Sequence, residues 1–99
     1  MAIKVHPSFA IHAGEWLKTE IVEANGVSIN ALTEAFGVSR QTVSAVLNGR
    51  QTLTADMAIR FENAFGVKAE TLLRMHTRYE LAKAREHGAD LAVKSLVAA

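Results

Sequence analysis

The segment 38–50, VSRQTVSAVLNGR, combines hydrogen-bonding side chains with apolar residues at helical spacing. Arg40 can donate two hydrogen bonds to O6 and N7 of guanine, and Gln41 can bridge N6 and N7 of adenine. Ser44 lies on the same side of a helical wheel and can bond to different bases. The segment therefore predicts a base-reading surface made of Arg40, Gln41 and Ser44, provided that its valines and leucine face a core.

Phosphate contacts are predicted for polar residues at the ends of this segment and at the start of the helix before it. Such side chains, together with backbone amides at helix starts, position a protein on DNA without reading its sequence. Six residues occupy these places: Ser28, Asn30, Ser39, Thr42, Asn48 and Arg50. No acidic residue lies between positions 38 and 49, so we expect the segment to be a local positive site.

The composition limits the kinds of function that are open to the chain. With 99 residues, 49% of them hydrophobic and 21% charged, we expect a single folded domain, with an arm at 1–11 and a tail at 88–99. The absence of cysteine excludes disulfides, thiol catalysis and thiolate zinc sites. We find no signal peptide and no membrane-spanning run, so we expect a cytoplasmic protein. The net charge is only +1, so DNA binding would depend on a local patch.

Apolar residues that recur every three or four positions predict five helices, so the expected fold class is all-α. We place them at residues 14–24, 29–36, 40–48, 55–65 and 69–87, and the first should bury Leu17, Ile21 and Ala24. The expected N-caps are Ser28, Ser39 and Thr54. Glycine tolerates the left-handed conformation that often ends a helix, so five glycines are expected stops: Gly26, Gly37, Gly49, Gly66 and Gly88.

The second and third helices, joined by FGVS, fit a helix-turn-helix arrangement. We expect Gly37 to permit the sharp turn, Val38 to fill the space between the helices, and Ala31 to be small where they cross. Three residues should hold the third helix in the core: Val43, Val46 and Leu47. An outward polar cluster is also common on solvated helices, so it is the combination with the turn that favours DNA binding.

The fifth helix is longer than a four-helix core needs. Its apolar stripe consists of Leu72, Met75, Tyr79 and Ala82. This stripe either covers the bundle or forms a dimer interface. The tail 88–99 has no helical period, and its apolar residues are either frayed or held by a partner.

Other candidate sites are weaker. The four histidines, His6, His12, His76 and His87, lack metal-ligand spacing, so we expect no metal and no other cofactor. No nucleophile motif surrounds Ser44, so we do not expect an enzyme. Two charged sets are most simply solvated faces. The first could also form a second nucleic-acid surface: Arg74, Arg78 and Arg85. The second could also meet a basic protein: Glu15, Glu20, Glu23 and Glu34.

Beyond these patterns, the chain resembles a known family. Residues 27–66, VSINALTEAFGVSRQTVSAVLNGRQTLTADMAIRFENAFG, are similar to the helix-turn-helix core of the phage-repressor-like XRE family. HAGEWLKTEIVE before the core and AETLLRMHTRYELAKAR after it resemble the flanks of HigA-type antitoxins. The resemblance implies a homodimer that binds a palindromic operator, represses its own operon and neutralises a HigB-like toxin that cleaves messenger RNA. A stand-alone XRE-family repressor and a scaffold that binds only protein are the alternatives.

Three residues depart from the family pattern. Ala13 stands where the family has proline, and Ile29 stands where a glutamine often contacts phosphate. The change at Ile29 implies weaker or differently registered DNA binding. Lys68 replaces the serine or threonine that usually caps the last helix, at a cost of about 1 kcal/mol unless another group caps it.

Overall fold

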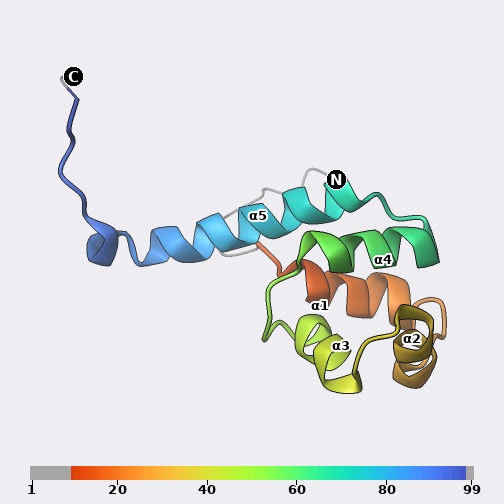
Figure 1. Cartoon of the computed structure of the whole chain (residues 1–99). Helices are drawn as coiled ribbons and strands as arrows, with labels where there is room; N and C mark the ends of the chain where they lie inside the picture. Colours follow the sequence, from red (N-terminus) through yellow and green to blue (C-terminus); the bar gives the residue numbers. More distant parts are fainter. Residues whose placement is uncertain (1–9, 98–99) are drawn as a thin grey trace, which may run out of the picture.

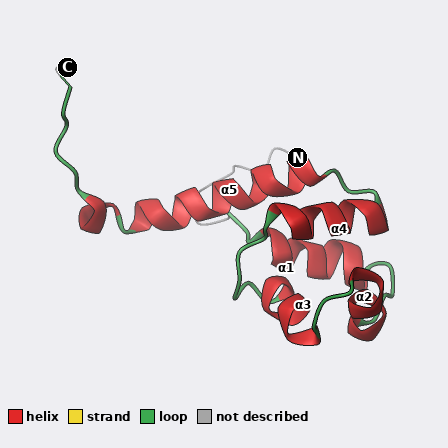
Figure 2. Ribbon diagram, in the orientation of Figure 1, coloured by secondary structure: helices red, strands yellow, loops and turns green. Residues whose placement is uncertain are grey.

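The computed structural model describes residues 10–97, which form helices and no β-strand (Figures 1 and 2). The first helix consists of α1 (Ala13–Leu17) and η2 (Lys18–Glu23), which follow each other without a break. The others are α2 (Ile29–Phe36), α3 (Arg40–Leu47), α4 (Ala55–Phe65), α5 (Ala69–Glu86) and the short 3₁₀ helix η3 (Gly88–Leu91). The predicted all-α class with five main helices is confirmed. Most of the predicted arm at 1–11 and the end of the tail lie outside the described residues.

The first helix differs from the expected one in its second half. Its η2 part is a π-helix, in which hydrogen bonds span five residues instead of four. The next fully buried side chain after Leu17 is therefore Val22, five positions further on. Ile21 is half-buried and packs against the core as predicted. Ala24 is exposed, so the prediction that it shares the core face of Leu17 is wrong.

Side-chain caps begin three helices as predicted. In each case a hydroxyl oxygen accepts a hydrogen bond from the backbone N–H three residues later: Ser28 at 3.1 Å, Ser39 at 3.1 Å and Thr54 at 3.2 Å. These bonds satisfy amides that have no partner within their own helix. The three predicted N-caps are confirmed.

Glycine ends α2 and α4 but not α5. Gly37 and Gly66 follow α2 and α4 in the left-handed conformation, with φ of 67° and 80°. Gly88 is not among the glycines with positive φ, and it begins η3, whereas α5 ends at Glu86 with His87 as its C-cap. Helix α5 therefore ends next to Gly88, but the prediction that Gly88 stops it in the left-handed conformation is wrong.

Helix α5 takes its N-terminal cap from another helix. Lys68, its N-cap residue, makes no capping hydrogen bond with its side chain. Glu62 of α4 supplies the missing acceptor, because its Oε2 accepts from the backbone N–H of Ala69 at 2.9 Å. A carboxylate at this place also suits the positive end of the helix dipole. The departure at Lys68 is therefore compensated within the chain.

One core is shared by all five main helices. Its largest fully buried side chains are Phe61, Leu17, Leu32, Leu47, Leu72 and Val43. Helix α5 packs on α4 and α1, while α3 packs on α1 and α2. The C-terminal half of α5 projects beyond the bundle, and the chain end extends from it (Figure 1).

The stripe on α5 is divided between the core and the surface. Leu72 has no exposed area, so it cannot contact a second subunit, and its assignment to a dimer interface is wrong. Met75, Tyr79 and Ala82 are half-buried. Within residues 10–97, no helix has the length and apolar character needed to cross a membrane.

Candidate nucleic-acid interface

A close crossing between α1 and α3 fixes the position of the third helix. A Cβ atom added to Gly14 would lie 1.9 Å from the carbonyl oxygen of Val46, so only glycine fits. Gly14 is thus the small residue on which α3 rests. The prediction that Ala31 has such a role between α2 and α3 is wrong, because Ala31 is exposed.

The turn between α2 and α3 has the predicted form. Gly37 is left-handed, and Val38 is half-buried and packs against the core. The inward residues of α3, Val43, Val46 and Leu47, are at most 3% exposed. Because the inward face of α3 is fixed in the core, the outward face of α3 has a single orientation relative to the rest of the fold.

The outward face of α3 carries the side chains predicted to read bases. Arg40 and Gln41 are exposed, and Ser44 is half-buried. The guanidinium Nη1 of Arg40 donates a hydrogen bond to Oδ1 of Asn30. The structure therefore brings together the starts of α2 and α3, with one predicted base-reading residue beside one predicted phosphate-binding residue.

The residues predicted to contact phosphate lie at the ends of α2 and α3. The hydroxyl groups of Ser28 and Ser39 are already helix caps, and Oγ of Ser39 also lies 2.8 Å from Oγ1 of Thr42. Arg50 is exposed just after α3. The backbone amides at these helix starts remain a suitable place for an anion.

Lys18 is a basic residue at this surface that the sequence pattern does not single out. Its Nζ donates to Oδ1 of Asn48 at 2.9 Å, at the far end of α3. Asn48 in turn donates from Nδ2 to the backbone oxygen of Ser44 at 2.9 Å and to its Oγ at 3.1 Å. Lys18 and Asn48 are 30 positions apart, and only the crossing of the first and third helices brings them together.

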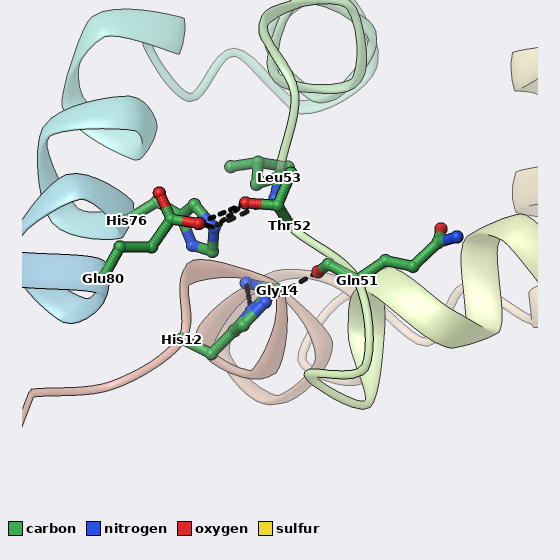
Figure 3. Close-up of polar contacts among 7 residues, drawn as sticks. All are labelled: His12, Gly14, Gln51, Thr52, Leu53, His76 and Glu80. Atoms are coloured by element: carbon green, nitrogen blue, oxygen red, sulfur yellow. Dashed lines mark hydrogen bonds and ion pairs between the residues drawn. The ribbon is translucent and has the colours of Figure 1, made fainter. Parts of the chain in front are cut away.

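Two buried histidines hold the segment that follows α3 (Figure 3). His12, the N-cap of α1, lies 2.7 Å through its Nε2 from the backbone oxygen of Gln51. His76 of α5 accepts at Nε2 from the backbone N–H of Leu53 at 3.0 Å. Burial lowers the pKa of His76, and the charge of nearby His12 lowers it further, whereas Glu80 acts in the opposite direction.

Among the described residues, no group of three or more histidine, aspartate or glutamate side chains is arranged to hold a metal ion. His6 lies outside the described residues. His12 and His76 instead use their ring nitrogens for hydrogen bonds to the backbone.

Comparison with known families identifies the class of protein. The helix-turn-helix family profile matches residues 19–72, more than half of the chain. The chain therefore belongs to the helix-turn-helix family of the XRE type. This is a family of DNA-binding regulators and not a family of enzymes.

Individual relatives identify the subgroup to which the chain belongs within this family. It is 41% identical to antitoxin HigA-1 of Vibrio cholerae over 71 residues, which cover 72% of this chain and 67% of that protein. It superimposes on antitoxin GraA with a TM-score of 0.79 and 34% identity, covering 88% and 97% of the two chains. For Pseudomonas aeruginosa antitoxin HigA, solved with the higBA promoter, the TM-score is 0.78 at 30% identity, with 89% and 99% covered. The chain belongs with the HigA-type antitoxins, which confirms the resemblance seen in the sequence.

Proposed function

We propose that the protein is the antitoxin of a type II toxin-antitoxin system, which binds its operator as a dimer, represses its own operon and neutralises a HigB-like ribonuclease. The observation that carries the DNA-binding part is the pair Arg40 and Gln41, exposed at the start of a helix whose other face is fixed in the core. The P. aeruginosa relative was solved with promoter DNA, which supports the same role here. A dimer on DNA implies a palindromic operator. A protein that represses a bacterial operon acts in the cytoplasm, so we propose this location.

In this proposal the interface has two kinds of contact. Arg40, Gln41 and Ser44 read base edges in the major groove. The phosphate contacts come from Ser28, Asn30, Ser39, Thr42, Asn48 and Arg50, and we add Lys18 because of its bond to Asn48. Phosphate contacts position the protein but carry no sequence information.

The test is a double variant, Arg40→Ala with Gln41→Ala, measured by footprinting and fluorescence anisotropy on the chain's own promoter. Each bidentate base contact contributes about 1–3 kcal/mol, so we expect operator affinity to fall by roughly 100-fold or more. Both side chains are exposed, so the fold and toxin neutralisation should be unchanged. Arg85→Ala, which removes an exposed arginine from the end of α5, is the matched control.

A double variant that binds the operator like the parent would place the recognition surface elsewhere. Promoter affinity that does not depend on salt would contradict DNA binding through several phosphates. The alternative function, a scaffold that binds only protein, would then be favoured. Repeating the footprint with the product of the neighbouring gene tests the toxin partner. If that product neither binds the protein nor cleaves RNA, the protein is a stand-alone repressor.

A further inference from the structure

Behind the candidate DNA surface, two buried histidines from distant parts of the chain lie in ring contact (Figure 3). The rings of His12 and His76 are 4.4 Å apart at an angle of 72°. Both are only 3% exposed. Together they bond to the backbone of residues 51 and 53, directly after the exposed Arg50.

The hydrogen bonds of His12 require one neutral form of its ring. Its Nδ1 accepts from the backbone N–H of Gly14 at 2.9 Å, so this nitrogen carries no proton. The proton is then on Nε2, which donates to the carbonyl oxygen of Gln51 at 2.7 Å. His12 therefore caps α1 through Nδ1 and holds Gln51 through Nε2.

His76 faces a choice of partners at a single nitrogen. Its Nε2 accepts from the N–H of Leu53 only when Nε2 has no proton. The same Nε2 lies 2.8 Å from Oγ1 of Thr52 and 3.4 Å from Oε2 of Glu80, which a protonated ring could bond as a donor. In the neutral form the proton is on Nδ1, which is buried without a partner. Oγ1 of Thr52 donates its hydrogen to Oε2 of Glu80, so it can accept from a protonated Nε2. Protonation would therefore exchange the bond to Leu53 for bonds to Thr52 and Glu80.

The segment that these rings hold is continuous with the DNA-facing residues. The backbone N–H groups of Arg50 and Gln51 both donate to the carbonyl of Ala45 in α3, at 2.8 and 3.2 Å. We refer to residues 48–53 as the post-recognition loop. We propose that His12 and His76 are positioning residues for the post-recognition loop, and that His76 holds Leu53 only while its ring is neutral, so that acid weakens operator binding. The inference rests on the proposed function.

The direction of the pH effect follows from the groups around His76. These are His12 from the start of α1, and Tyr79 and Glu80 from α5 itself, while the loop contributes Thr52, which does not titrate. Burial is the main cause that lowers the pKa of His76 below its ordinary value of 6.5. The unfolded chain therefore takes up this proton first, so the contribution of neutral His76 is complete above pH 6.5 and is lost as the pH falls through its lowered pKa.

The first experiment needs no DNA and uses the parent chain. A ¹H–¹⁵N titration from about pH 8 to about pH 5 should move the Leu53 amide with the same midpoint as the ring protons of His76. A Leu53 amide that stays constant while the His76 ring titrates would overturn the proposal.

The second experiment measures operator affinity by anisotropy at constant salt, at about pH 7.5 and about pH 5.5, for the parent, His76→Gln and His87→Gln. Glutamine can accept from Leu53 but cannot be protonated, and His87 is the matched exposed histidine at the C-cap of the same helix. We expect acid to weaken binding about fivefold, or about 1 kcal/mol, in the parent and in His87→Gln, and less than about twofold in His76→Gln.

The sign of the acid effect separates this mechanism from general electrostatics. Added positive charge by itself strengthens binding to phosphates, so parent affinity that is constant or higher in acid would overturn the proposal. If the parent does not bind its promoter even at about pH 7.5, the proposed function fails, whereas the titration of Leu53 still tests the histidine pair.

Discussion

At the scale of single residues, the absence of a side chain at Gly14 decides where α3 lies. Gly14 is buried, and its Cα faces the carbonyl of Val46 so closely that a Cβ would come within 1.9 Å of the oxygen. A backbone carbonyl in a helix cannot rotate away as a flexible side chain can. The position of α3, and of Arg40 on it, therefore depends on the absence of one carbon atom.

Gly14→Ala should consequently destabilise the fold, although alanine is the better helix former. The added methyl must push α1 and α3 apart, and overpacking of this kind costs about 1–3 kcal/mol or more. We expect the free energy of unfolding, measured with urea, to fall by at least about 2 kcal/mol. Gly88→Ala is the control, because nothing lies within 4 Å of its added Cβ. Equal urea midpoints for the two variants would contradict the close crossing.

Sequence reasoning succeeded for residues whose environment depends on helical period alone. Exposed Arg40 and Gln41 and buried Val43 follow from their places on one helix. Gly14 and Lys18 could not be found in this way, since their contacts depend on how the first helix crosses the third.

At the scale of elements, the start of α5 is held by a residue seven positions upstream. Glu62 lies in the last turns of α4, and its carboxylate accepts from the N–H of Ala69 across the turn that joins the two helices. This one bond caps α5 and fixes the geometry of the connection. Local sequence patterns predicted the helices and three caps. A cap supplied by a neighbouring helix leaves no pattern in the local sequence, and the π-helical geometry of η2 leaves no such pattern.

Removing this cap should weaken the start of α5. Glu62→Ala leaves the Ala69 amide without its acceptor, and loss of a helix cap costs about 1 kcal/mol. Hydrogen exchange should rise at the amides of the first turn of α5 while the rest of the core changes little. Glu34→Ala, an exposed acid in α2, serves as the control and should leave that exchange unchanged. Unaltered protection of Ala69 in Glu62→Ala would show that another group caps the helix.

At the scale of the whole molecule, a helical bundle carries a long arm. The dimensions are 53 × 35 × 20 Å, and α5 and the chain after it account for the elongation (Figure 1). Apolar side chains stay exposed along this arm: Leu81, Leu91, Val93, Leu96 and Val97. If the dimer that we propose for operator binding forms through this arm, a second copy of the chain covers these side chains.

Leu81→Glu should therefore weaken the dimer without unfolding the monomer. Leu81 is 46% exposed, so the change leaves the core intact, but a charge would have to be buried where the two copies meet. We expect the dimer dissociation constant to rise by at least about tenfold, measured by sedimentation, because burial of a leucine contributes about 1.5–3 kcal/mol. Operator affinity should fall in parallel, since a single half-site contact is weaker than two linked ones. Ile59→Glu is the matched control, because Ile59 is 47% exposed but lies on α4. If both variants remain dimeric at the same concentrations as the parent, the exposed half of α5 is not the dimer interface.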